Sequence, residues 1–192
     1  MPLPLSNHPM SWLRSARTES RFFLAAAVIS AAAALSLAPR IAAAEENPAC
    51  EQFAWSVKRE LALFAASNFE TVFSGAMIPA LPEKGIVIEL QPHVTVDYVL
   101  PPGREPKSED SKGGVVSISN VPKGSYQITL SEHAWIDVIQ NGKELAPTAH
   151  TGKLDCAGVR KSVRFGLEPG PLTIQVSGAA SNQIKLAILP VE

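Results

Sequence analysis

The feature that most constrains the fold is a two-residue alternation of apolar and polar side chains that begins near Gly85 and continues to the end of the chain. Runs such as "VTVDYVL" (94–100) and "SYQITLS" (125–131) are typical of strands that bury one face. Further runs of this kind are "IVIEL", "VVSIS", "AWIDVIQ", "SVRFGL", "PLTIQVS" and "IKLAIL". About nine short strands separated by turns predict an all-β fold, an antiparallel β-sandwich over residues 85–192.

Two stretches between the strands carry turn or loop signals. Asn141-Gly142, between "AWIDVIQ" and "KEL", is the strongest short signal for a β-hairpin. The stretch "PPGREPKSEDSKGG" (101–114) combines proline, glycine and charges of both signs. Because it offers nothing to bury, we expect it to be a mobile loop.

The residues before the sandwich favour one helix and a connector, over residues 45–84. Asn47 is a suitable N-cap and Pro48 suits the first helical position. An apolar stripe then recurs at spacings of about three to four residues, at Phe53, Val57, Leu61 and Phe64. We therefore expect an N-terminal α-helix packed on the sandwich. The next segment, 69–85, is apolar but interrupted by glycine and proline, and we expect it to be a packed connector.

Residues 1–44 have the composition of a secretory signal peptide. Arg14, Arg17 and Arg21 precede an apolar run over 22–38, and Ala42 and Ala44 suit the two small positions of an A-x-A cleavage site. The alternative is an uncleaved anchor, for which the run is short and weakly hydrophobic. We expect export by the general secretory route to the periplasm or beyond, leaving residues 45–192 as a single globular domain.

The charge of the exported part argues against two classes of partner. From residue 45 onward the chain has 17 acidic and 13 basic side chains, a net charge of about −4. This balance does not suggest nucleic acid or an anionic membrane surface as partner. No second apolar run is long enough to span a bilayer, so we expect no membrane span after cleavage.

Cys50 and Cys156 are the only cysteines of the chain. Two cysteines in an exported protein usually pair, so we expect a disulfide that ties the start of the helix to the sandwich. This pairing makes Cys156 a structural residue rather than a metal ligand or nucleophile.

The residues after Cys156 offer a candidate binding face. On a strand starting at Lys161, Arg164 lies on the face opposite to Val163 and Phe165, and Arg160 lies just before the strand. Arg160, Lys161 and Arg164 together predict a site for a carboxylate, sulfate or phosphate. The alternative is a solvated outer face with cross-strand ion pairs.

Candidate residues for three other kinds of site are present in the sequence. His93, His133 and His150 are the candidate ligands of a non-haem iron centre with cupin-like geometry, although none of them has a tight ligand spacing. Trp55 and Trp135 could form an aromatic platform only if they were exposed, and core packing is the default for both. The chain has no G-x-S-x-G motif, and the nearby Ser131, His133 and Asp137 are not expected to meet in triad geometry.

Two stretches carry a resemblance to known proteins. "KGSYQITLSEHAWIDV" and "GVRKSVRFGLEPGPLTIQVSGA" resemble parts of the jelly-roll modules called bacterial pre-peptidase C-terminal domains, and the likeness covers about Gly114 to Leu189. The chain also resembles a group of uncharacterised exported alphaproteobacterial proteins. Some of these carry a dioxygenase label that these residues do not explain. The resemblance implies a jelly-roll-like sandwich and supplies no activity.

Taken together, the sequence predicts an exported, non-catalytic binding or interaction module of the cell envelope that needs no cofactor. Its expected partner is an envelope protein or a small anionic or glycan ligand. The alternative is a metal-dependent enzyme such as an iron dioxygenase, which would use the three histidines.

Overall fold

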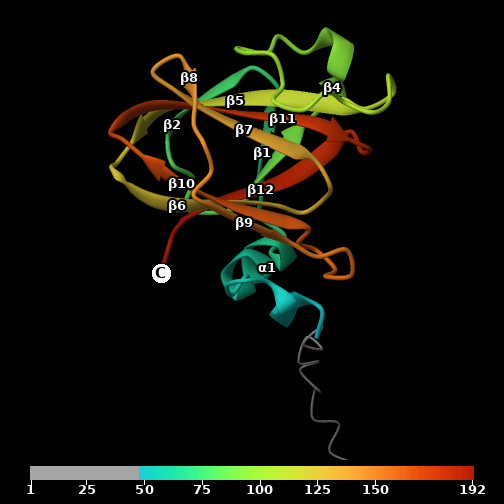
Figure 1. Ribbon diagram of the computed structural model, residues 1–192, viewed down its shortest axis with the longest axis vertical. Helices are drawn as coiled ribbons and strands as arrows, with labels where there is room; N and C mark the ends of the chain where they lie inside the picture. Colours follow the sequence, from blue (N-terminus) through green and yellow to red (C-terminus); the bar gives the residue numbers. More distant parts are fainter. Residues whose placement is uncertain (1–47) are drawn as a thin grey trace, which may run out of the picture. The chain divides into compact units, whose positions relative to one another are not determined.

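The computed structural model describes residues 48–192, and the expected signal peptide lies outside these residues. The described chain forms two facing β-sheets, so the all-β sandwich predicted from the sequence is confirmed (Figure 1). Sheet A has the strand order β1 (Glu70–Phe73), β3 (Ile86–Glu89), β12 (Gln183–Pro190), β6 (Gly124–Leu130), β10 (Lys161–Leu167) and β9 (Ala149–Gly152). Sheet B has the order β2 (Ala76–Ala80), β5 (Lys112–Val121), β11 (Gly170–Ala179), β7 (Trp135–Gln140) and β8 (Lys143–Glu144), and β4 (Gln91–Pro92) pairs with β5.

Both sheets are mixed rather than purely antiparallel. β1 pairs with β3 in parallel, and β2 pairs with β5 in parallel. These strands form where one stretch of chain passes from sheet A to sheet B: Ser74 donates its N–H to Glu89 of sheet A, and Gly75 donates its N–H to Val115 of sheet B. Gly75 has a φ of 93°, which suits glycine. The sandwich therefore includes part of the segment that we expected to be a connector.

The core lies between the sheets and is built from the alternating apolar residues of their strands. Ile128, Leu130, Phe165, Ile174 and Val176 are among its buried members. Several strands are buried on both faces, because segments outside the sheets also cover their outer surfaces. In Figure 1, α1 lies below sheet A, and the segment that contains β4 lies above sheet B.

The N-terminal segment is less helical than predicted. It has a 3₁₀ turn, η1 (Cys50–Gln52), and a short α-helix, α1 (Lys58–Ala65), and Phe53 between them is extended. Here tertiary contacts override the helical pattern: Ala54 N–H donates to Thr151 Oγ1 at 3.0 Å, and Trp55 Nε1–H donates to Ser162 Oγ at 3.2 Å. The predicted apolar stripe still packs together, with Leu61 half-buried and the others buried, in a small cluster of its own that includes the two cysteines, Val159 and Ala187.

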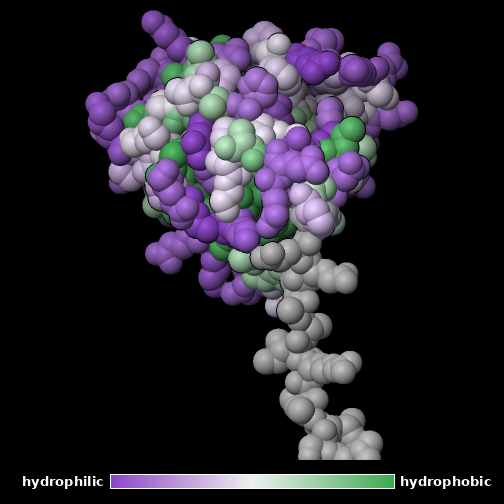
Figure 2. All heavy atoms as spheres, turned by 60° about the horizontal axis from the view of Figure 1, so that its bottom comes forward, coloured by the Kyte–Doolittle hydropathy of each residue, from purple (hydrophilic) through white to green (hydrophobic). Residues whose placement is uncertain are grey.

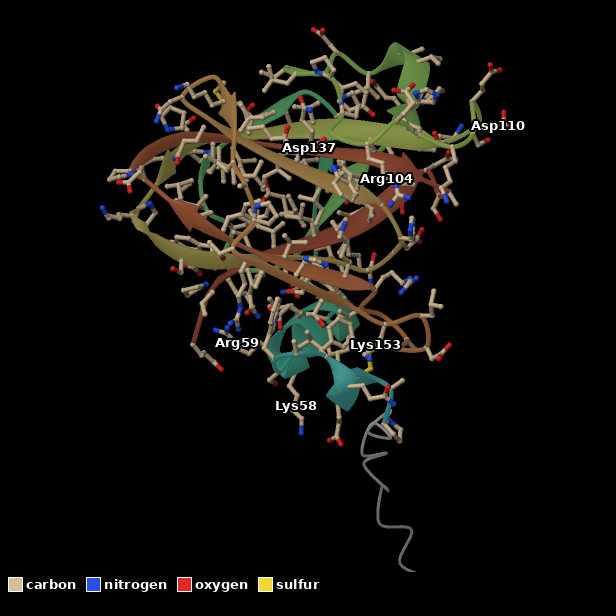
Figure 3. The ribbon with its side chains drawn as sticks, in the orientation of Figure 1. Lys58, Arg59, Arg104, Asp110, Asp137 and Lys153 are labelled. Carbon is tan, nitrogen blue, oxygen red and sulfur yellow. A yellow bond between two sulfur atoms is a disulfide. The ribbon has the colours of Figure 1, made fainter. Side chains whose placement is uncertain are left out.

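The predicted disulfide is present. The Cα atoms of Cys50 and Cys156 lie 4.7 Å apart across a sequence separation of 106 residues. Figure 3 shows the sulfur atoms close to Lys153, beside the N-terminal segment. The bridge therefore attaches η1 to the loop between β9 and β10, as we expected from the sequence.

The strand predicted over residues 94–100 is absent. His93–Thr95 form a 3₁₀ turn, η2, and the chain from Val96 to Arg104 has no strand partner. The buried side chain of Gln175 replaces a neighbouring strand, since its Oε1 accepts the N–H groups of Val99 (2.6 Å) and Leu100 (3.1 Å). We call residues 98–104 the strap, because they cross the outer face of sheet B.

The predicted hairpin at Asn141-Gly142 is confirmed. The turn joins β7 to β8, and Asn141 and Gly142 have φ values of 54° and 71°. Two positive φ values at adjacent turn residues suit a two-residue hairpin connection.

Candidate functional site

The three predicted binding residues do not form one face. Arg164 lies under the N-terminal segment: its guanidinium carbon is 4.0 Å from the centre of the Trp55 ring, and its Nη2 donates to Gln127 Oε1 at 3.2 Å. Arg160 and Lys161 instead line a pocket that lies elsewhere on the sandwich. The structure thus separates Arg164 from the two other basic residues.

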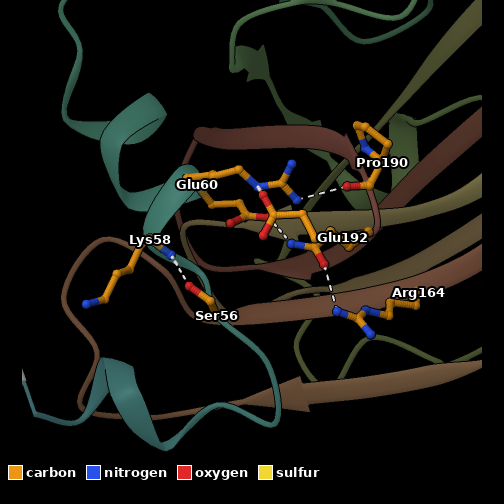
Figure 4. A network of polar contacts seen from close by, with 8 residues as sticks. Ser56, Lys58, Glu60, Arg164, Pro190 and Glu192 are labelled. Carbon is orange, nitrogen blue, oxygen red and sulfur yellow. Dashed lines mark hydrogen bonds and ion pairs between the residues drawn. The ribbon is translucent and has the colours of Figure 1, made fainter.

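Arg164 belongs to a buried polar network beneath α1 (Figure 4). Gln127 accepts a hydrogen bond from Arg164 and donates one from Nε2 to Glu60 Oε1. Glu60 is fully buried, and its Oε2 has no hydrogen-bond partner. The Gln127 amide therefore joins the buried Glu60 carboxyl group to the Arg164 guanidinium beneath a short helix.

The surface around α1 is mostly hydrophilic (Figure 2). Figure 2 brings this side forward and shows mostly hydrophilic residues, with apolar residues in small scattered patches. Single exposed apolar side chains are ordinary on protein surfaces. The pocket lined by Arg160 and Lys161 is therefore the stronger candidate.

This pocket has a volume of about 570 Å³, within the range of small-molecule sites. Its walls come from the loop before β5, the starts of β7 and β10, β9 and the end of β11. Four basic and two acidic side chains line it: Arg104, Lys107, Arg160, Lys161, Glu105 and Asp110. The pocket therefore has an excess of positive charge in a chain whose net charge is negative.

Trp135 lines the pocket, and two cations contact its ring. Lys161 Nζ lies 4.4 Å from the centre of its ring, and the guanidinium carbon of Arg104 lies 5.7 Å from it. Both contacts are within the range of cation–π attraction. Neither cation forms an ion pair with a carboxylate within residues 48–192. An arginine and a lysine thus share one indole ring, and neither forms a salt bridge with a carboxylate of the described chain.

Asp137 fixes the positions of the Trp135 ring and of the loop that carries Arg104. It is 3% exposed, its Oδ1 accepts the indole N–H of Trp135 at 2.7 Å, and its Oδ2 accepts the N–H of Gly103 at 3.1 Å. Because Gly103 directly precedes Arg104, one buried carboxylate positions both the ring and the loop that carries the arginine.

The electrostatics of Lys161 follow from this geometry. Burial lowers the pKa of Lys161 below its ordinary value, the nearby Arg104 lowers it further, and Asp137 opposes both effects. Burial and a like charge both disfavour the ammonium form. A negative charge beside Lys161 has the opposite effect and favours the ammonium form.

Ser177 adds a polar group that lacks a partner. It lies directly opposite Trp135 in the pairing of β11 with β7, and it lines the pocket. Its side chain is 1% exposed, and its Oγ has no hydrogen-bond partner. Unsatisfied buried hydroxyls are rare in folded proteins and call for an explanation.

The histidines proposed as iron ligands are not assembled. His133 and His150 are exposed and line the pocket, whereas His93 lies on η2 and is absent from the lining. Among residues 48–192, no group of three histidine, cysteine or acidic side chains is arranged to hold a metal ion. Asp137, the carboxylate near His133 in sequence, is occupied by Trp135 and Gly103.

Sequence reasoning missed Arg104 and Ser177, and it considered Asp137 without predicting its role beside Trp135. Arg104 lies in the loop that we expected to be mobile, and no periodicity marks it. A signal did exist for Asp137, because an acidic residue in the middle of a strand with apolar residues on both faces needs a buried partner. Ser177 gave no signal in the sequence.

Comparison of the chain with protein-family models, with curated proteins and with solved structures found no match. The resemblance to pre-peptidase C-terminal domains and to exported alphaproteobacterial proteins therefore stays a prediction. Among the described residues, no helix has the length and apolar character needed to cross a membrane.

Proposed function

We propose that this protein is an exported, non-catalytic binding module of the cell envelope, and that it holds a small anionic ligand in the Trp135 pocket. The observation that carries the proposal is the pair of cations, Arg104 and Lys161, on one indole ring without a carboxylate partner in the described chain. Lys161 is half-buried, and a half-buried cation binds an anion more strongly than an exposed one does, because water screens it less.

The setting of the pocket supports binding rather than catalysis. Asp137, the buried carboxylate nearest to Trp135, accepts hydrogen bonds with both of its oxygens. Around the ring, cations and a hydroxyl line the pocket.

The export of the protein is part of the same proposal. The disulfide supports it, because such bridges form and persist in oxidising compartments. The composition of residues 1–44 supports the general secretory route, with the periplasm or the exterior as destination.

The proposal is tested by anion binding to the purified, disulfide-bonded protein. Isothermal titration calorimetry would use inorganic phosphate, sulfate, acetate and succinate, with neutral glucose as reference. The variant Arg104→Ala/Lys161→Ala should lose most of the affinity for whichever anions bind.

The matched control is Lys123→Ala/Lys143→Ala, which removes the same charge from two exposed lysines that do not line the pocket. The control should keep the wild-type affinity. Absence of binding to every anion would contradict the proposal, as would equal losses in the two variants.

A further inference from the structure

We infer that the group recognised in the Trp135 pocket is a tetrahedral oxyanion, the phosphate or sulfate of a monoester, rather than a carboxylate. This inference rests on the proposed function and specifies its ligand. Several hydrogen-bond donors lie around Trp135, and they come from different directions.

The donors come from three separate elements. Arg104 extends from the strap, Lys161 from β10 of sheet A, and Ser177 from β11 of sheet B. The first two contact the Trp135 ring, and the third faces Trp135 across the β7–β11 pair, where side chains lie about 5 Å apart. All three are therefore neighbours of Trp135, and they reach it from three different elements.

The shape of the anion follows from this arrangement. A carboxylate offers two oxygens in one plane, which suits the fork of a single arginine. A phosphate or sulfate monoester offers three terminal oxygens pointing in different directions, one for each of the three donors. A monoester also adds more negative charge than a carboxylate when it is a phosphate.

The Ser177 hydroxyl is the observation that favours three donors over two. A fully buried hydroxyl without a partner is unfavourable, and a charged acceptor would satisfy it. Because Ser177 is 1% exposed, an oxyanion reaches it only after a lining side chain shifts. Arg104 is exposed and comes from a loop, so it is the side chain that we expect to shift.

The rest of the pocket has room for the organic part of an ester. Its volume of about 570 Å³ exceeds that of one oxyanion, and small uncharged residues form part of the wall: Pro106, Ala134, Gly178, Ala179 and Ala180. The organic part of the ester could therefore be a compact group such as a sugar, packed against these small residues.

The test compares three acids built on one sugar: glucose 6-phosphate, glucose 6-sulfate and glucuronate. Calorimetric titrations of wild type should show at least one of the two esters binding about tenfold or more tightly than glucuronate. Ser177→Ala should weaken the binding of that ester by about tenfold or more and leave glucuronate unchanged. The two ester arms distinguish a phosphate from a sulfate ligand.

Ser177→Ala should fold normally, because its hydroxyl bonds to nothing in the described chain. Ser125→Ala removes an exposed serine hydroxyl outside the pocket and should bind all three acids as wild type does. Glucuronate binding as tightly as both esters would overturn the inference and leave the proposed function standing, and so would an unchanged ester affinity in Ser177→Ala. Failure of all three acids to bind would overturn both.

Discussion

Asp137 and Gln175 lie directly opposite each other on β7 and β11, and together they hold the strap on the outer face of sheet B. Gln175 bonds to Val99 and Leu100, and Asp137 bonds to Gly103. Two buried polar side chains thus replace the strand that the alternation at residues 94–100 predicted. They also fix the chain just before Arg104, so the position of the pocket depends on them.

Gln175→Leu should destabilise the protein and disturb the pocket together. The substitution removes three hydrogen bonds and leaves the N–H groups of the strap without their acceptor, at a cost of about 1–3 kcal/mol. Urea unfolding measures the loss. Gln183→Leu, which removes an exposed glutamine, is the control and should differ little from wild type. Equal stabilities of the two variants would show that the strap is not held by Gln175.

Asp137→Asn should lower two pKa values at once. The carboxylate of Asp137 opposes the fall in the pKa of Lys161 and contributes to the rise in the pKa of Tyr98. Its removal by a nearly isosteric amide should therefore lower both pKa values, which NMR titrations of the lysine side chain and of the tyrosine ring can follow. A pKa that stays unchanged at both residues would contradict the place of Asp137 in this network.

Tyr98 should make the protein sensitive to alkali. Burial, with a smaller contribution from Asp137, raises the pKa of Tyr98 from 10.0 to about 12. Since the pKa is higher in the folded chain, the stabilising contribution is complete below pH 10 and is lost as pH rises from 10 to about 12. The free energy of unfolding should fall more between about pH 9 and about pH 11 for wild type than for Tyr98→Phe.

Tyr98→Phe is itself informative at neutral pH. The hydroxyl of Tyr98 is buried without a partner, and it lies where a Cβ at Gly113 would be only 2.0 Å away. Removing that hydroxyl should leave the stability unchanged or raise it slightly. If the free energy of unfolding changed equally with alkaline pH in wild type and in Tyr98→Phe, this would contradict a raised pKa of Tyr98.

Loss of the disulfide should loosen the N-terminal segment before the sandwich. The chain-entropy model gives about 4–5 kcal/mol for a loop of roughly a hundred residues, so Cys50→Ser/Cys156→Ser should unfold at much lower guanidinium concentration. The apolar residues of this segment form a cluster separate from the main core. Hydrogen exchange should therefore accelerate first in α1. Similar exchange of α1 in the oxidised wild type and in the variant would contradict this order.

The strands that the sequence predicts well are those that alternate and are bounded by turns. β6, β7, β10, β11 and β12 all follow this description, and Asn141-Gly142 marks the hairpin because few other residues adopt two successive positive φ values. The pairing of Cys50 with Cys156 followed from their number and from the export signal. These signals are local or depend on composition, which is why they can be recognised without a structure.

The remaining features depend on contacts between distant parts of the chain. The helical stripe that starts at Phe53 is divided because Trp55 bonds to Ser162, and the alternation at 94–100 is not a strand because Gln175 occupies its N–H groups. Arg164 was expected on an outer face but is covered by Trp55. The pocket needs Arg104, Trp135, Lys161 and Ser177 from four elements, and no pattern in the sequence shows that they meet.

The most direct test of the account is an NMR titration of the disulfide-bonded protein with glucose 6-phosphate and glucose 6-sulfate, observed at the tryptophan indole N–H signals. Trp55 and Trp135 are the two tryptophans after residue 44, and they lie in different environments. The account predicts that the Trp135 signal shifts and saturates with at least one ester while the Trp55 signal stays in place. If the Trp135 signal does not move with either ester, or if both signals move together, the pocket around Trp135 is not the binding site.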